Sequence, residues 1–349
     1  MAQKSSSPNF GLSPRKLGYR MRAEWELHEA TWLSWPRDLE TWPKELNEIE
    51  SIYVKIIKHL YEGEKVRILI HDSAEEAHVR RLLLKEGIKE NIFFHEIPTD
   101  SPWIRDYGPT FVTEKTGRLA LINWVFNAWG KKYAAYERDD AVPSQIAESL
   151  HVKEFQSDLV MEGGAIEVNG AGTCLVTEQC LLNPNRNPSL GQKEIEQVLK
   201  DFLDLKQIIW LGEGIAGDDT DGHVDEIARF VSTDTICAVS EENSGDENFS
   251  ALRENKTRLS GNSFRLVLLP MPEKIERNGK RYPASYANFY IGNKAVLVPI
   301  FGQKTDAKAL GILRELFPDR KVVGMEGIPL VYGQGAFHCI TQQQPAASV

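Results

Sequence analysis

Apolar and polar positions along this chain form a pattern that repeats. Two short apolar stretches separated by a turn occur in residues 110–122, 165–176, 228–239 and 288–298. Three of these turns contain Thr-Gly, Asn-Gly or Gly-Asn, which favour the backbone conformations of a tight hairpin. The pattern predicts four β-hairpins.

Most of these hairpins are followed by a segment with helical spacing. Residues 194–205 and 306–317 carry apolar side chains three and four positions apart, as do residues 46–61 near the N-terminus, so each predicts an amphipathic helix. Another apolar stretch then follows and predicts a strand, at residues 66–70, 207–211, 265–269 and 321–324. The predicted unit is therefore strand–strand–helix–strand.

This unit recurs about every sixty to seventy residues, so roughly five units fit the chain, and a fixed period indicates an array, ring or solenoid. A generic α/β domain with mixed strand pairing is the alternative. Residues 241–254 are polar and predict a surface loop or an irregular helix. Because no Pro/Gly-rich linker or charge block divides the chain, we expect a single domain over residues 1–349.

Composition narrows the classes of partner. The formal net charge is -9 and no long run of Lys or Arg occurs, which disfavours nucleic acid and anionic membranes as partners. Residues 1–15 are polar and lack the apolar core of a secretion signal. No apolar stretch is long enough to span a membrane. The four cysteines are too sparse for a disulfide scaffold, so we expect reduced thiols and a cytoplasmic location.

Polar residues beside Gly and Pro gather in four segments, at 101–109, 161–164, 217–225 and 333–345. Each segment follows a late strand of one unit and precedes the next hairpin. If the units form a ring, equivalent loops converge on one axis. We therefore expect these four segments to build a common site.

Cys339 is the candidate nucleophile, because it follows glycines in a polar segment where a thiolate could be exposed and activated. Cys174, Cys180 and Cys237 lie in apolar strand patterns and are expected to be core residues. A buried, inert thiol is the alternative for Cys339. His223 is a candidate general acid/base, since Asp225 two residues later would share its face of a strand.

The remaining candidates are carboxylates with less specific surroundings. Asp106 lies beside Arg105 and three residues after Trp103, and a surface ion pair would explain the same pattern. Glu162 precedes two glycines, which a tight turn would also explain. The aspartates between 218 and 225 could suggest a metal, but they lack a calcium-loop or His-x-x-x-His pattern, so we expect no metal.

A cysteine, a histidine and three carboxylates fit chemistry on a planar cation, because carboxylates pair with it through forked, charge-assisted hydrogen bonds. A cysteine protease would not need the additional acids, and a glycosidase would need two acids but no cysteine. The combination therefore favours nucleophilic attack on a guanidinium carbon.

Six motifs in order resemble the agmatine deiminase family, which includes bacterial peptidyl-arginine deiminases. They are residues 21–36, Trp-x-Arg-Asp-x-Gly-Pro at 103–109, Glu-Gly-Gly at 162–164, Leu-Leu-Asn-Pro-Asn-Arg-Asn-Pro at 181–188, Gly-His-Val-Asp at 222–225 and His-Cys-Ile-Thr-Gln-Gln at 338–343. The resemblance covers nearly the whole chain. It implies a pentein fold, a five-bladed pseudo-symmetric α/β propeller of ββαβ repeats.

The resemblance also implies roles for individual residues. Cys339 would be the nucleophile, His223 the acid/base, Asp106 and Asp225 the guanidinium clamp, and Glu162 the acid that holds the histidine or the far side of the substrate. Trp103 would pack on the substrate's alkyl chain, and Arg105 and Asp221 are assigned to substrate binding with it.

The implied reaction converts agmatine to N-carbamoylputrescine and ammonia through a thiouronium on Cys339, without metal or cofactor. Free arginine, peptidyl arginine and transfer of the amidino group remain alternatives, as does a non-catalytic binding module. Ala336, Phe337, Glu167 and Asp221 depart from residues often seen in the family, which leaves the substrate's tail open. The resemblance is compatible with a homo-oligomer.

Overall fold

The computed structural model describes residues 13–37 and 41–347. These residues form a mixed α/β fold with five sheets of three or four strands and a separate two-stranded hairpin. Most of the polar N-terminal segment considered for a secretion signal, residues 1–12, lies outside the described residues. No helix in the described ranges is both long and apolar enough to cross a membrane.

The four predicted hairpins are confirmed, and each is antiparallel. Their strands are β5 (Thr110–Glu114) with β6 (Leu119–Val125), β8 (Glu167–Val168) with β9 (Thr173–Thr177), β11 (Ala228–Ser232) with β12 (Thr235–Ser240), and β16 (Tyr290–Ile291) with β17 (Ala295–Ile300).

Helices connect the second strand of each hairpin to a parallel third strand, so the predicted repeat of strand, strand, helix and strand is confirmed. The crossovers are α6 (Val142–Leu150) to β7 (Lys153–Val160), α7 (Glu178–Leu181) and α8 (Gln192–Leu203) to β10 (Gln207–Leu211), α9 (Phe249–Ser260) to β13 (Arg265–Pro270), and α10 (Lys304–Leu316) to β18 (Lys321–Glu326). The polar segment 241–254 is a loop only up to the start of α9.

The fifth sheet joins the two ends of the chain. β19 (Gln342–Pro345) pairs antiparallel with β2 (His28–Ser34), and β3 (Lys65–Ile70) and β4 (Ile92–Glu96) continue the sheet in parallel. This pairing places the segment that carries Cys339 beside the N-terminal strands. The remaining strand, β1 (Tyr19–Met21), extends the β5 sheet, and η1 (Pro14–Leu17) precedes it.

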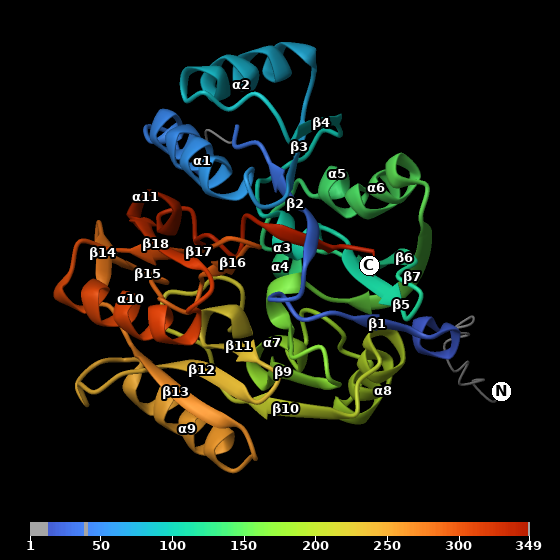
Figure 1. Cartoon of the computed structure of the whole chain (residues 1–349). Coiled ribbons are helices and arrows are strands. Elements are labelled where there is room, and N and C mark those ends of the chain that lie inside the picture. The colour runs from blue at the N-terminus through green and yellow to red at the C-terminus, as the bar shows by residue number, and fades with distance from the viewer. Residues whose placement is uncertain (1–12, 38–40, 348–349) are drawn as a thin grey trace.

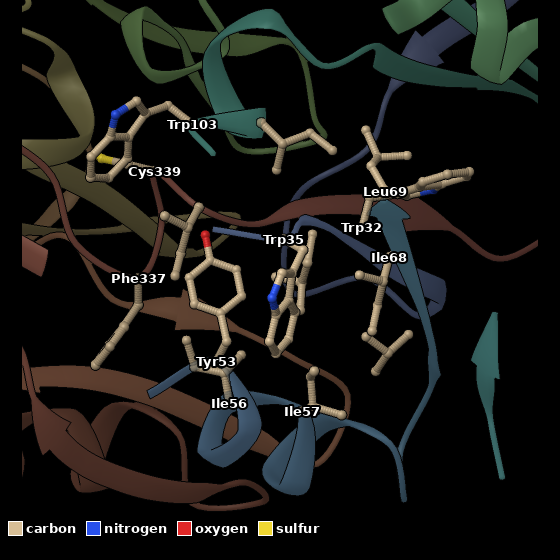
Figure 2. Close-up of a cluster of buried hydrophobic side chains, with 14 of the residues drawn as sticks. Trp32, Trp35, Tyr53, Ile56, Ile57, Ile68, Leu69, Trp103, Phe337 and Cys339 are labelled. Atoms are coloured by element: carbon tan, nitrogen blue, oxygen red, sulfur yellow. The ribbon is translucent and has the colours of Figure 1, made fainter. Parts of the chain in front are cut away.

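Two helices cover the fifth sheet, α1 (Leu46–Leu60) and α2 (Ser73–Lys85). The three- and four-residue spacing predicted in α1 buries one apolar face, including Ile49, Tyr53 and Ile56. This face packs against strand residues of the sheet in one hydrophobic cluster, and Figure 2 shows Trp103 and Cys339 together at one side of that cluster. Burial of each such side chain contributes about 1.5–3 kcal/mol.

The long helices α1, α2, α9 and α10 lie at the periphery, whereas the short helices α3 (Ile104–Tyr107) and α4 (Ala128–Lys131) lie near the centre (Figure 1). The other short elements are α5 (Glu137–Asp140), α11 (Ile328–Val331), η2 (Gly163–Ala165), η3 (Val224–Glu226) and the hairpin of β14 (Ile275–Arg277) with β15 (Lys280–Tyr282).

Candidate active site

Three of the four polar segments predicted from the sequence line one cavity of about 840 Å³. The fourth, residues 161–164, does not line it but contacts Asp106 through the Gly164 N–H. Asp106 from α3 and Cys339 from the turn before β19 line the cavity wall, and Trp103 lies beside them. Further lining residues come from the chain around α4 and from both sides of the entrance, including Phe126, Trp129, Tyr133, Arg138, Asp219, Lys280, Tyr332 and Gln334.

Cys339 lies in a polar environment although only 6% of its surface is exposed. Asn288 Nδ2 donates to its Sγ over 3.1 Å, and Sγ lies 3.7 Å from Asp225 Oδ2 and 3.9 Å from Glu226 Oε1. Burial and the charges of these carboxylates raise the pKa of the Cys339 thiol well above its usual range. A cation placed against the carboxylates would oppose this effect and favour the thiolate.

His223 lies between two carboxylates. Its Nδ1 is 3.6 Å from Asp106 Oδ1, and its Nε2 is 3.7 Å from Glu162 Oε2. Burial lowers the pKa of His223, but Asp106, Cys180 and Glu162 outweigh it and raise that pKa well above the usual value. Among the described residues neither ring nitrogen has a hydrogen-bond partner, so a protonated ring would have both N–H groups free to donate.

Asp106 accepts two neutral hydrogen bonds. Gly164 N–H donates to Oδ1 over 3.0 Å, and Trp129 Nε1–H donates to Oδ2 over 2.9 Å. Burial raises the pKa of Asp106 to about 6 despite the nearby His223. A Cβ on Gly164 would lie 2.8 Å from Asp106 Oδ1 and 2.5 Å from His223 Nδ1, which explains why a glycine occupies this position of the Glu-Gly-Gly motif.

Glu162 is held by an arginine to which the sequence analysis gave no role. Arg186 Nε donates to Glu162 Oε1 over 2.6 Å, and both side chains are fully buried. Burial raises the pKa of Glu162, but His223 and Arg186 together bring it below the usual value. Arg186 belongs to the motif at 181–188, so its place in the motif was the available signal.

Asp225 is hydrogen-bonded to a histidine. His338 Nδ1 lies 2.6 Å from Asp225 Oδ2, and His338 Nε2 lies 2.8 Å from Glu24 Oε2. Burial raises the pKa of Asp225, but the hydrogen bond and charge of His338 bring it below its usual value. Within the described residues Asp225 Oδ1 has no hydrogen-bond partner, which leaves one oxygen to accept from a ligand.

Arg105 does not line the cavity, and the expectation that it binds substrate stays a prediction. Its guanidinium donates to Gln343 Oε1 over 2.6 Å, to the His338 carbonyl over 3.3 Å and to Glu24 Oε2 over 3.3 Å. The side chain is 3% exposed and faces the chain ends. Arg105 therefore anchors the segment that carries Cys339.

Asp221 also lies outside the set of cavity-lining residues, and its assignment to substrate binding stays a prediction. Its Oδ2 accepts from Arg186 over 2.8 Å and from Asn185 over 2.9 Å, and its Oδ1 is 2.8 Å from Lys132 Nζ. Asp221 therefore orients Arg186, while its neighbour Asp219 reaches the cavity.

Cys180 departs from the expectation that it lies in a strand. It lies in α7, and its Sγ is 3.9 Å from Glu162 Oε2, whereas Cys174 and Cys237 are buried in β9 and β12 as expected.

Glu162, Cys180 and His223 present ligand atoms within 4.8 Å of one another, as do Asp225, Glu226 and Cys339. These two groups are the places among the described residues where a metal could be held.

Three of the departures from the family pattern are buried residues that do not line the cavity. Glu167 is buried and pairs with Arg229 over 2.9 Å, and its Oε1 accepts from the Phe230 backbone. Ala336 and Phe337 are buried in the hydrophobic clusters. These substitutions therefore change the packing beneath the site.

Comparison with known proteins gives consistent matches along the whole chain. Residues 20–345 match the family described as Porphyromonas-type peptidyl-arginine deiminase. The chain is 36% identical to a Legionella pneumophila protein named "Putative agmatine deiminase", over 97% of this chain and 98% of that protein.

Solved structures of two related enzymes superpose closely. The agmatine deiminase of Enterococcus faecalis is 31% identical with a TM-score of 0.90, covering 97% of this chain and 99% of that one. A cysteine-to-serine variant of C. jejuni agmatine deiminase with substrate bound is 33% identical with a TM-score of 0.88, covering 95% and 97%. This chain therefore belongs to the Porphyromonas-type peptidyl-arginine deiminase family, as an agmatine deiminase-like hydrolase of amidine C–N bonds.

Proposed function

We propose that this protein hydrolyses agmatine to N-carbamoylputrescine and ammonia through a covalent thiouronium on Cys339. The observation that carries the proposal is that Cys339 and Asp106 line one cavity, with Asp225 3.7 Å from Cys339 Sγ and His223 3.6 Å from Asp106. The related C. jejuni agmatine deiminase with substrate bound supports a guanidino compound as the ligand of this site.

Asp106 and Asp225 bind the guanidinium from two sides in this proposal. Each is a buried carboxylate, and forked hydrogen bonds from guanidinium N–H groups to such acids are strong and directional. The bound positive charge offsets the repulsion that raises the pKa of Cys339, so substrate binding favours the thiolate. The indole ring of Trp103, which lines the cavity, covers the alkyl chain.

In the first half-reaction, Cys339 Sγ forms a bond to the guanidinium carbon. The C–N bond to one terminal nitrogen then breaks, and protonated His223 donates the proton with which that nitrogen leaves as ammonia. The product on the enzyme is an S-alkyl thiouronium. The raised pKa of His223 keeps this proton available at neutral pH.

In the second half-reaction, neutral His223 accepts a proton from water, and the water oxygen bonds to the thiouronium carbon. As the C–S bond breaks, the remaining proton of the added hydroxyl is released to solvent, the ureido product leaves and the Cys339 thiolate is restored. Glu162 and Arg186 hold the histidine ring from behind throughout. Arg105 and Asp221 act as supports from outside the cavity.

The proposed fold is a single five-bladed α/β propeller with the site on its axis. Its support is that the five sheets share one pairing order, in which an antiparallel pair is followed by a parallel pair. The four polar segments also occupy equivalent positions after these sheets, and three of them line one cavity.

Free arginine is a second candidate substrate, because Lys280 lines the cavity and could pair with an α-carboxylate. A blocked arginine peptide tests whether the entrance admits a larger tail. An amidinotransferase would share the first half-reaction and then give the amidino group to an amine instead of water.

The test is ammonia release from agmatine, arginine and a blocked arginine peptide, with Cys339→Ala as the control. We expect release from agmatine that the substitution abolishes. Release only from arginine or from the peptide would move the substrate and keep the mechanism. No release from any of the three would leave the proposal unsupported.

A further inference from the structure

The short helix α4, which contributes Trp129 to the cavity, has an unusual backbone conformation. Ala128, Trp129, Gly130 and Lys131 in α4 all have positive φ, at 55°, 52°, 88° and 64°. Residues with a Cβ rarely adopt this left-handed region, and a run of them persists only where the surrounding contacts impose it. Such strain clusters at functional sites, so these four residues, here called the left-handed turn, call for a physical explanation.

Local hydrogen bonds hold the left-handed turn. Asn127 Oδ1 accepts from Gly130 N–H over 2.8 Å, and its carbonyl accepts from Lys131 N–H over 2.7 Å. Asn127 Nδ2 in turn donates to the Asn185 carbonyl over 3.0 Å. The turn is therefore tied to the loop that carries Arg186.

The turn brings one side chain to Asp106. Trp129 is 8% exposed, and its ring packs edge-on against Phe126 with 5.1 Å between ring centroids. In this position its Nε1–H donates to Asp106 Oδ2 over 2.9 Å, while Gly164 holds Oδ1.

The same turn also lies against Arg186, the residue that holds Glu162. A Cβ on Gly130 would collide with Asn185 Nδ2 and Arg186 Nη1, and Arg186 donates to Glu162 over 2.6 Å. Asp106 and Glu162 are the two acids on either side of His223. One strained element therefore contacts the partners of both acids.

We propose that Trp129 is a positioning residue for deimination, whose indole N–H keeps Asp106 oriented and ionised for the guanidinium. The inference rests on the proposed function. Burial raises the pKa of Asp106 to about 6, and the hydrogen bond from Trp129 opposes this. A protonated Asp106 would lose its charge-assisted hydrogen bonds to the substrate.

The charged groups that face Asp106 come from three neighbouring segments. His223 and Asp225 lie at the start of η3, Glu162 precedes η2, and Cys339 lies in the turn before β19. His223 lowers the pKa of Asp106, and the two carboxylates raise it. Removing the indole donor leaves these groups in place, so the pKa of Asp106 rises further.

Trp129→Phe tests this, because Phe keeps a ring against Phe126 and lacks the N–H. Trp124→Phe is the matched control, since Trp124 is also a buried tryptophan, 6% exposed, whose Nε1–H donates over 2.9 Å, but to Thr110. We expect Trp129→Phe to lower kcat/KM by about 10- to 100-fold near neutral pH. In the pH profile of kcat/KM, the acidic limb of Trp129→Phe should move to higher pH, whereas the acidic limb of Trp124→Phe should stay in place.

A double-mutant cycle with Asp106→Asn separates a role through Asp106 from general damage. If Trp129 acts through Asp106, the Phe substitution costs little more once Asp106 is replaced. Gly130→Ala is a second variant should Trp129→Phe not fold, because it displaces the turn and keeps the indole; it should move the acidic limb in the same direction.

An unchanged acidic limb in the foldable variants, or a full additional loss in the Asp106→Asn background, would overturn the inference. The proposed function fails separately, since it requires wild-type turnover of agmatine that Cys339→Ala abolishes. Active wild type with normal Trp129→Phe would therefore sink only the inference.

Discussion

Asp106 and Asp225 are proposed for the same task, yet the protein holds them in opposite ways. Asp225 is paired with His338, which connects through Glu24 to Arg105 and Arg229. Asp106 accepts from the neutral N–H groups of Gly164 and Trp129. The pKa of Asp225 is consequently lowered, whereas burial raises the pKa of Asp106 to about 6.

This difference means that the two carboxylates of the proposed clamp are stabilised in their ionised form to different degrees. On the Asp225 side, the hydrogen bond and charge of His338 lower the pKa of the carboxyl and favour its ionised form. The Asp106 half depends on His223, on two neutral donors and on the incoming cation. The pKa of Asp106 is therefore expected to set the pH range over which the substrate binds.

The largest effect is expected from replacing Cys339, the proposed nucleophile that both Asp106 and Asp225 serve. Cys339→Ala should lower kcat on agmatine by about 10⁴-fold or more, because the covalent route is lost. Ammonia release measures this. Cys237→Ala, which removes a buried thiol in β12, is the matched control and should leave kcat unchanged. Comparable loss in both variants would contradict the assignment of Cys339.

The second largest effect is expected from replacing Glu24, the carboxylate that links His338 to two arginines on the Asp225 side. Glu24→Gln leaves His338, Arg105 and Arg229 without their shared carboxylate, so the free energy of unfolding should fall by about 3–5 kcal/mol. Chemical denaturation measures it. Glu64→Gln removes another buried carboxylate, which contacts His28, and should destabilise the fold while keeping kcat. Equal kcat in both variants would argue against a link from Glu24 to the site.

The pH profile should report the Asp106 side. Because its folded pKa is raised to about 6, Asp106 becomes protonated as pH falls through that value, and kcat/KM should drop about tenfold per pH unit below it. Asp225, with its lowered pKa, adds no limb there. A profile without an acidic limb near this pH would contradict the contrast between the two acids.

Stability should respond with opposite signs to neutralising each acid. Asp106 has a folded pKa of about 6, above the ordinary 3.8, so its ionised form costs stability above pH 6. Asp106→Asn should therefore raise the free energy of unfolding at neutral pH by about 1–2 kcal/mol. Asp225→Asn removes a carboxylate with a lowered pKa, whose contribution is present at neutral pH and lost as pH falls through the folded pKa.

Asp225→Asn should therefore lower the free energy of unfolding at neutral pH. Thermal or urea unfolding of the two variants against wild type measures both signs. If the free energy of unfolding changed with the same sign in the two variants, the proposed electrostatic difference between Asp106 and Asp225 would be contradicted.

The repeat was predictable from the sequence because hairpin turns and helical spacing are local signals. Residues 110–122 and 194–205 are examples in which the pattern and the elements agree. The pairing of β19 with β2 was not, since the partners lie at opposite ends of the chain and no local pattern links them.

The candidate site was predictable only where a motif carried it. Asp106, His223 and Cys339 were found in polar, Gly-flanked segments and meet at the cavity or directly behind it. The contacts of Arg105 were not predictable, because the sequence gives no direction for a side chain, and here it faces Glu24. Trp129 was missed because its role depends on a strained backbone that no spacing predicts.

The most direct test of the account is mass spectrometry of the enzyme quenched in acid during turnover of agmatine. The account predicts that the peptide containing Cys339 carries a thiouronium adduct, that Cys180, the other thiol near His223, stays unmodified, and that Cys339→Ala carries no adduct. Steady ammonia release without an adduct on Cys339, or an adduct on another residue, would contradict the central claim that Cys339 is the nucleophile.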